Sequence, residues 1–342
     1  APAANGDAWQ APVMWLGAFF VLATIGFTMA AIPYAATAGE MTDDPGERSI
    51  MLGYRMAFAS VGILIGGGVI PLLAGGTRDG TFMAVVMISP VVLISIWGSL
   101  YATRHAPRVQ TPSTQQMFET LRLVFRNTPF LVLVVFYGIM TLAIAQITAG
   151  MPLAAKYLVD GGNLTLLFAP FVVGAMASQI LWTLLSLRMG KAPAMAIGVM
   201  CYIGVTALLY VALPSTSLAL IMGLMLLAGI ANGAYQAIPW AMYPDLMDVT
   251  RHDTGAAIEG AFSAVWLFGQ KVANALAPLL LGGYIMAAGW RETTEGTVDQ
   301  SDAALAALHQ AMTVMPMGIF CVAAVVFLGV YRPMTRRFLR TL

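Results

Sequence analysis

Nine long apolar runs constrain the fold of this chain more than any other feature. A helix needs about 20 apolar residues to cross the hydrocarbon core of a bilayer, and each run is of about that length. The runs cover residues 12–37, 50–73, 81–101, 128–150, 163–187, 192–213, 216–240, 257–288 and 305–331. They are too continuous for the short alternating strands of an outer-membrane barrel. The sequence therefore predicts an all-α membrane protein with nine transmembrane helices.

The composition excludes several classes of function. Of the 342 residues, 59% are hydrophobic and only 10% are charged, whereas soluble domains carry about 25% charged residues. A soluble enzyme and a nucleic-acid-binding protein are therefore excluded, and the expected partners are the lipid bilayer and a small-molecule substrate. The sequence contains no nucleophile–base pair, metal-ligand cluster or nucleotide-binding loop. We expect neither an enzyme nor a bound cofactor or metal.

The distribution of Lys and Arg predicts the orientation in the membrane. Twelve of the 17 basic residues fall on the side of the C-terminus, and three, Arg78, Lys156 and Arg291, fall in loops on the other side. The C-terminus is therefore expected in the cytoplasm of a multi-pass cell-membrane protein, with a bacterial inner membrane as the expected location. Because the number of spans is odd, residue 1 is then expected outside.

An internal repeat predicts a larger architecture. Ala-Ile-Pro-Tyr-Ala at 31–35 recurs as Ala-Ile-Pro-Trp-Ala at 237–241. Each copy is followed by an acidic loop, a span rich in small residues and a proline at a matching position, Pro71 or Pro278. The alternative is a coincidence of composition. If the repeat is real, its unit is six spans, and the chain holds nine of an expected twelve.

The repeat divides the chain into three parts. Residues 1–101 are the second half of an N-terminal six-helix bundle, whose first three spans are expected to be missing from this chain. Residues 102–127 are a cytoplasmic linker, in which 113–127 is predicted to be a short interfacial helix, with an irregular loop as the alternative. Residues 128–342 are the C-terminal six-helix bundle and a cytoplasmic tail.

Two charged segments carry a resemblance to a known family. Residues 38–48 read Ala-Gly-Glu-Met-Thr-Asp-Asp-Pro-Gly-Glu-Arg and precede Tyr54-Arg55. The second segment is Pro239-Trp240-Ala241-Met242, followed by Asp245, Asp248, Thr254-Gly255, Glu259-Gly260 and Gln270-Lys271. Together with two six-span halves, these segments resemble the glycoside–pentoside–hexuronide:cation symporter family of the major facilitator superfamily. The resemblance implies a transporter with a coupling ion, Na⁺ or H⁺, and no other cofactor.

The chain also departs from that family. Ala31 stands where a melibiose-permease-like sequence has a sugar-binding acid, and the cation-binding acids of the family lie on a second span that this chain lacks. The resemblance implies that Arg55 is a substrate-site arginine. Its alternative is an arginine that extends its charge to the membrane surface.

Lys271 is the most informative single residue, because it lies near the middle of the run 257–288. A lysine at that depth costs at least about 2.5–3.5 kcal/mol on insertion scales. It shares a helical face with Ser263, Trp266 and Gln270, and no other run contains a mid-membrane carboxylate. We predict that Lys271 faces the central cavity and couples transport to a cation. A purely structural pair is the alternative.

Other polar residues in or beside the apolar runs are candidates for the remaining sites. The candidate substrate-binding residues are Tyr34, Arg55, Gln146, Gln179, Tyr235, Gln236 and Trp266. Hydrogen bonding between helices is the alternative for the isolated glutamines. The candidate cytoplasmic gate residues are Asp43, Glu47, Arg48, Asp245, Asp248 and Arg251. They are predicted to form a charge network that joins the two halves, and solvated surface charge is the alternative.

The sequence thus predicts a secondary transporter that moves a small polar solute, of the sugar or glycoside class, together with a cation by alternating access. A cation-coupled carrier of lysolipids or other amphiphiles is the first alternative, favoured by Ala31 and by the 23 methionines. The second alternative is a truncated membrane scaffold that no longer transports.

Overall fold

The structure is a computed structural model that describes residues 10–41, 45–74, 78–106, 117–160, 164–214, 217–254, 258–291 and 298–338. Within these ranges, the elements of the chain are all helices, which confirms the predicted fold class. The helices are α1 (Gln10–Glu40), α2 (Pro45–Leu64), the π-helical η1 (Ile65–Val69), α3 (Ile70–Ala74), α4 (Arg78–Thr103), α5 (Met117–Arg126), α6 (Thr128–Tyr157), α7 (Leu164–Met189), α8 (Lys191–Ala212), α9 (Leu218–Thr254), α10 (Glu259–Ala287), α11 (Asp302–Met312), α12 (Val314–Val325), the π-helical η2 (Val326–Tyr331) and α13 (Arg332–Phe338).

Eight helices of the described part are long and apolar enough to cross a membrane. They coincide with eight of the nine predicted spans, and the eighth of them runs through α11, α12 and η2 into α13. The remaining predicted span, 50–73, lies within the continuous helical run of α2, η1 and α3. The first eleven residues of that run, which begins at Pro45, include Glu47, Arg48 and Arg55, and these charged residues lower its mean hydropathy.

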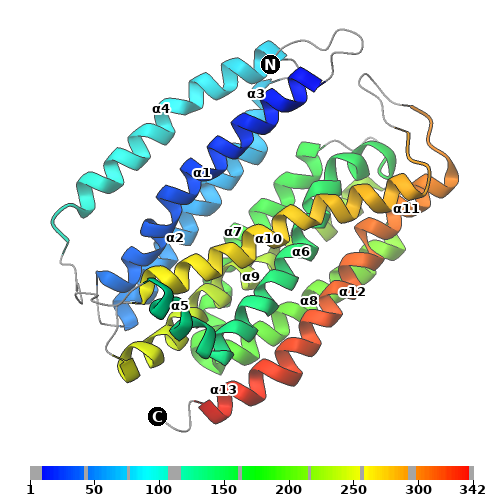
Figure 1. Ribbon diagram of the computed structural model, residues 1–342. Coiled ribbons are helices and arrows are strands. Elements are labelled where there is room, and N and C mark those ends of the chain that lie inside the picture. The colour runs from blue at the N-terminus through cyan, green and yellow to red at the C-terminus, as the bar shows by residue number, and fades with distance from the viewer. Residues whose placement is uncertain are drawn as a thin grey trace.

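The helices form two groups that lie side by side in Figure 1. Helices α6 to α12 (green to red) pack together, with α7 against α9, α6 against α10 and α8 against α9. Helices α1, α2 and α4 (blue to cyan) lie on one side of them, and α4 is outermost. The two groups meet where α1 contacts α10 and where α2 contacts α7 and α9.

Small residues allow α7 and α9 to approach closely. A Cβ atom added to Gly229 of α9 would lie 2.8 Å from the carbonyl carbon of Phe171 and 2.9 Å from the amide nitrogen of Ala175, both on α7. Next to this contact, the carbonyl oxygen of Ile230 accepts hydrogen bonds from Ser178 Oγ at 3.1 Å and Trp182 Nε1 at 2.6 Å. Close approach combined with hydrogen bonds is the usual way in which helices associate in lipid, where apolar burial alone gains little.

The short helix α5 covers residues 117–126 of the segment 113–127, for which an interfacial helix is predicted, and residues 113–116 lie outside the described part of the chain. The helix ends at Arg126. The next residue is Asn127, whose Oδ1 accepts a hydrogen bond from the amide of Phe130 at 3.0 Å and so caps α6. The same side chain donates through Nδ2 to the carbonyl oxygen of Leu246 at 2.8 Å and to Thr250 Oγ1 at 2.9 Å. One buried asparagine therefore fixes the start of α6 against α9.

The core of the α6 to α12 group consists of two hydrophobic clusters. The larger one is rich in aromatic side chains and lies towards the end of the molecule that holds α5 and α13. The smaller one, which includes Leu158, Leu213 and Ile285, lies towards the opposite end. The aromatic cluster borders the junction with α1 and α2, since it contacts Ala31 and Ile32 of α1.

Candidate functional site

Arg55 connects three helices at the junction of the two groups. Its guanidinium carbon lies 4.8 Å from the ring centre of Tyr34 on α1 and 5.0 Å from that of Trp240 on α9. Such cation–π contacts stabilise a buried cation by about 0.5–2 kcal/mol. The side chain is half-buried and its Nη1 atom is fully buried. The structure therefore places two predicted substrate-binding residues, Tyr34 and Arg55, in direct contact.

Tyr137 of α6 lies at the centre of the aromatic cluster beside this arginine. Its ring stacks on Trp266 with a centre-to-centre distance of 4.3 Å and on Tyr235 at 4.9 Å. Its hydroxyl oxygen accepts hydrogen bonds from Trp240 Nε1 at 3.1 Å and from Gln270 Nε2 at 3.0 Å. The cluster thus brings α6, α9 and α10 to one point and contains two more of the predicted residues, Tyr235 and Trp266.

A cavity of about 350 Å³ adjoins the cluster between α6, α9 and α10. Its lining is Thr141, Ile144, Ala145, Thr148, Ala149, Tyr235, Gln270, Asn274 and Pro278. Tyr235 belongs to both the cavity and the cluster, and Gln270 in the cavity wall donates to Tyr137 of the cluster. The Tyr235 hydroxyl hydrogen-bonds to Thr141 Oγ1 at 2.7 Å. Hydroxyl, amide and aromatic groups are the ones that commonly orient a small polar ligand in a pocket.

Of the three candidate glutamines, Gln179 and Gln236 contact each other, and Gln146 lies elsewhere. Gln146 is fully buried, and its Nε2 donates to the carbonyl oxygen of Ala311 on α11 at 2.9 Å. Gln179 Nε2 donates to Gln236 Oε1 at 3.1 Å and so joins α7 to α9. Both contacts are hydrogen bonds between helices, which is the alternative to substrate binding for the isolated glutamines. No glutamine of this set lines the 350 Å³ cavity, and their contact with a substrate stays a prediction.

Lys271 directly follows Gln270 in α10, but its side chain contacts α1, whereas that of Gln270 contacts α6. Its Nζ donates a hydrogen bond to Thr28 Oγ1 of α1 and lies 5.3 Å from the ring centre of Phe27. The side chain lines an open groove of about 830 Å³ formed by α1, α5, α6 and α10, and the lining is otherwise almost wholly apolar. Among the described residues, no carboxylate forms an ion pair with it. Lys271 therefore faces the contact between the two helix groups.

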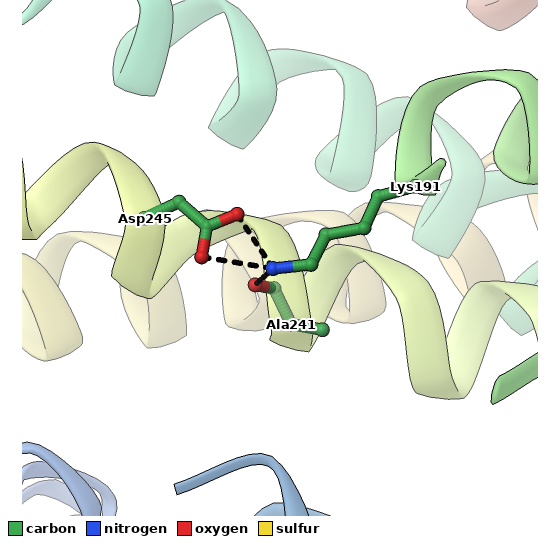
Figure 2. Close-up of polar contacts among 3 residues, drawn as sticks. All are labelled: Lys191, Ala241 and Asp245. Carbon is green, nitrogen blue, oxygen red and sulfur yellow. Dashed lines mark hydrogen bonds and ion pairs between the residues drawn. The ribbon is translucent and has the colours of Figure 1, made fainter. Parts of the chain in front are cut away.

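The gate candidates are only partly described. Asp245 of α9 accepts hydrogen bonds from Lys191 Nζ at 2.8 Å and 2.6 Å, and the same ammonium donates to the carbonyl oxygen of Ala241 at 2.9 Å (Figure 2). Lys191 follows Gly190, whose φ of 92° allows the sharp turn between α7 and α8. This ion pair joins two helices of the same group. A charge network between the groups stays a prediction.

The other gate candidates give no further test of that network. Glu47 is exposed and Asp248 is half-buried. Asp43 and the side chains of Arg48 and Arg251 lie outside the described residues. Across the part of the chain that is described, no group of His, Cys, Asp or Glu side chains is arranged to hold a metal ion.

Sequence reasoning missed three aromatic residues of the cluster. Trp240 contacts Arg55 and Tyr137, and Tyr243 stacks on Trp266 at 5.1 Å. A signal for Trp240 was available, because it follows Pro239 in the repeated motif at the position where Tyr34 follows Pro33. Tyr137 and Tyr243 gave no such signal, since tyrosine is common in membrane helices.

Comparison with known proteins decides the family. A family profile described as "MFS/sugar transport protein" matches residues 2–333, which is nearly the whole chain. The protein belongs to the MFS/sugar transport family. Several similar proteins have names that fit the glycoside–pentoside–hexuronide:cation symporter family, which the two charged segments resemble. A putative sulfoquinovose importer of Salmonella typhimurium is 25% identical over 93% of this chain and 68% of its own length.

Two further relatives show the range of this family. The putative glycoside/cation symporter YagG of Escherichia coli is 24% identical over 80% of this chain and 60% of its own length. The sphingosine-1-phosphate transporter MFSD2B of Mus musculus is 26% identical over 77% of this chain and 58% of its own length. The family member described here therefore spans about two thirds or less of the length of these relatives. It is a multi-pass helical membrane protein of a transporter family.

Proposed function

We propose that this protein is a secondary transporter that moves a small polar solute of the sugar or glycoside class together with Na⁺ or H⁺ by alternating access. The observation that carries the proposal is the cavity between α6, α9 and α10, with Tyr235 and Gln270 in its wall and Arg55 behind the adjoining aromatic cluster. Aromatic faces pack against the apolar face of a sugar ring, while amides and hydroxyls bind its hydroxyl groups. The names of the glycoside/cation symporter and sulfoquinovose importer relatives support this class.

Lys271 is the proposed link between the cation and the substrate. An ammonium at this depth is stable only with a carboxylate, a hydroxyl or water beside it, and its one described hydrogen-bond partner is a neutral threonine. We expect two carboxylates to approach it from a helix packed into the groove along α1 and α10. Two carboxylates beside one lysine leave a net negative charge, which attracts Na⁺ or H⁺.

Solute uptake with and without an imposed sodium or proton gradient tests the proposal. In cells or vesicles that hold the full-length protein, Lys271→Ala should abolish gradient-driven accumulation of a glycoside while the binding affinity changes less. Lys156→Ala removes a lysine outside this junction and serves as the matched control. Accumulation by Lys271→Ala with an unchanged ion dependence would show that the coupling mechanism is wrong.

A carrier of amphiphiles is the second candidate, and one observation favours it. The groove beside Lys271 is open, apolar and larger than the cavity, so its dimensions suit an acyl chain whose head group reaches Lys271. The sodium-dependent lysophosphatidylcholine symporter of Mus musculus is 22% identical over 76% of this chain. Competition of a lysolipid with glycoside uptake, measured in the same vesicles, separates the two candidates. A substrate lysolipid should also accumulate in response to the ion gradient.

A further inference from the structure

Each of the three helices around the cavity of about 350 Å³ contains a proline four residues after a residue that lines the cavity. The pairs are Thr148 and Pro152 of α6, Tyr235 and Pro239 of α9, and Asn274 and Pro278 of α10. A helical carbonyl accepts a hydrogen bond from the amide four residues later, and proline has no amide hydrogen. The carbonyl oxygens of Thr148, Tyr235 and Asn274 therefore lack their usual donor. We call these three oxygens the freed carbonyls.

The three helices continue past their prolines, so the missing hydrogen bonds are not avoided by ending a helix there. No side chain in the described part of the chain donates to a freed carbonyl. Residues four apart share one face of a helix, so each freed carbonyl lies on the face that its residue presents to the cavity. Lipid offers no donor to such an oxygen, and a partner must come from the protein, water or a ligand.

The hydroxyl protons of the cavity wall are already used within the protein. Thr148 Oγ1 donates to the carbonyl oxygen of Ile144 at 2.8 Å, and Thr141 Oγ1 donates to that of Tyr137 at 2.7 Å. Because Thr141 has no second hydroxyl proton, the Tyr235 hydroxyl is the donor in the hydrogen bond between them. The wall therefore presents mainly hydrogen-bond acceptors to a ligand.

The cavity is also lined without charge. None of the described residues in its wall is Asp, Glu, Lys, Arg or His. Gln270 Nε2 donates to the Tyr137 hydroxyl at 3.0 Å, which leaves the amide of Asn274 as the main side-chain donor of the wall. A cation would enter without a carboxylate to balance its charge, and an anion would meet acceptors. Neutral hydroxyl groups satisfy the freed carbonyls without either cost.

We propose that the cavity recognises a polyhydroxylated ligand by its hydroxyl protons, which are donated to the freed carbonyls. Pro152, Pro239 and Pro278 are then specificity-determining residues, because each keeps one backbone acceptor open. The inference rests on the proposed transport function and states how the solute is recognised. Backbone carbonyls are fixed by the helices that carry them, so their arrangement selects which hydroxyl positions of a ligand must keep a proton.

Deoxyfluoro sugars test this inference, because fluorine replaces a hydroxyl group and has no proton to donate. The parent probe is whichever of 4-nitrophenyl β-D-glucoside, 4-nitrophenyl β-D-galactoside and 4-nitrophenyl α-D-galactoside binds the purified full-length protein most tightly. The parent is compared with its analogues that carry fluorine at one hydroxyl position each. At least two of them should bind roughly 3- to 10-fold more weakly, as the loss of one neutral hydrogen bond produces.

Proline variants connect each fluorine penalty to one carbonyl. Pro278→Ala supplies the amide hydrogen that the Asn274 carbonyl lacks, so this carbonyl is bonded within α10. The parent probe should then bind roughly 3- to 10-fold more weakly, and the penalty for fluorine at one position should disappear. Pro152→Ala and Pro239→Ala should each remove the penalty at one position in the same way. A general effect on the fold would weaken all probes alike and leave the penalties in place.

Pro90→Ala is the matched control, because Pro90 also lies inside a helix, α4, but outside the cavity wall. The carbonyl that it leaves without a donor is that of Val86, whose side chain is exposed. This variant should leave every affinity and every penalty unchanged. Each fluorine penalty is a ratio of two affinities measured in one protein, so it stays interpretable where a variant also changes the melting temperature.

The outcomes distinguish the inference from the proposed function. Equal affinities of the parent and its analogues, no binding of any glycoside, or penalties that persist in all three cavity variants would overturn the inference. Variants that lose a dependence of binding on Na⁺ but keep every penalty would show that the freed carbonyls bind the ion, which also overturns it. Gradient-driven uptake together with persistent penalties would support transport and contradict the inference. Position-specific penalties without gradient-driven uptake would do the reverse.

Discussion

Replacing Gly229 by alanine should force α7 and α9 apart. The new Cβ would collide with the carbonyl oxygen of Phe171 and lie 2.8 Å from its carbonyl carbon, where ordinary van der Waals contact begins at 3.4 Å. The atoms that it meets belong to the backbone of α7, so no side chain is able to rotate away. The distance to the carbonyl carbon alone requires the helices to separate by about 0.6 Å, and the nearer carbonyl oxygen requires more; interiors packed at crystal density resist such a shift.

The energetic cost follows from the contacts beside this glycine. A shift of that size would lengthen the hydrogen bond from Ser178 Oγ to the Ile230 carbonyl oxygen from 3.1 Å to about 3.7 Å, where it is no longer effective. Its loss costs about 1 kcal/mol, and overpacking adds about 1–3 kcal/mol. Alanine recovers about 1 kcal/mol through its higher helix propensity. The net loss in the free energy of unfolding is about 2 kcal/mol.

Thermal unfolding in detergent measures this effect. For a chain of 342 residues, a loss of that size lowers the melting temperature by roughly 3 °C. Gly223→Ala is the matched control, because it lies on the same helix and its added Cβ would meet nothing within 4 Å. Its melting temperature should equal or slightly exceed that of the wild type. If Gly229→Ala proves as stable as Gly223→Ala, the close approach of α7 and α9 described here is incorrect.

Three further predictions concern other parts of the molecule. Asn127→Ala removes a helix cap and two hydrogen bonds to α9, so it should lower the free energy of unfolding by about 2–3 kcal/mol in the same thermal assay; a change under 0.5 kcal/mol would contradict it. Asp245→Asn breaks a partly exposed ion pair with Lys191, and it should change stability by no more than about 1 kcal/mol; a larger loss would show that the pair supports the fold. Single cysteines at Thr77 and Thr297 should react with an impermeant thiol reagent from outside intact cells, and reaction only after lysis would reverse the predicted orientation.

The positions of the helices were predictable because a bilayer leaves the backbone few options. Each apolar run must close its hydrogen bonds internally, so hydropathy locates the helices directly. It does not locate their ends. The run predicted for 216–240 continues as helix to Thr254. The turns beyond Trp240 contain charged residues and are helical although they are not apolar. Hydropathy identifies the apolar segment that can cross the membrane, and it gives no information about polar turns by which the same helix extends beyond that segment.

The site was predictable only where a residue conflicts with its surroundings. Arg55 and Lys271 are charged residues in apolar runs, so they were recognisable as residues that need a partner. Tyr137 is an aromatic residue in an apolar run, so nothing in the sequence distinguishes it. Its central place in the cluster depends on the way in which α6, α9 and α10 come together. The hydrogen-bond partner of Gln146 was equally unpredictable. It is a backbone carbonyl of α11, 165 residues further along the chain, and sequence alone does not show that the two meet.

The shallow burial of the first helices affects how the two groups move against each other. The apolar stretch of α1 has no buried residue, and only 6% of that of α4 is buried. Lipid chains solvate apolar side chains about as well as another helix does, so sliding α1 along α10 exchanges contacts of similar free energy. Directional contacts, such as those of Arg55 with Trp240 and Lys271 with Thr28, then decide which arrangement is preferred. A ligand or ion that competes for these few groups shifts the equilibrium between arrangements without disturbing the core.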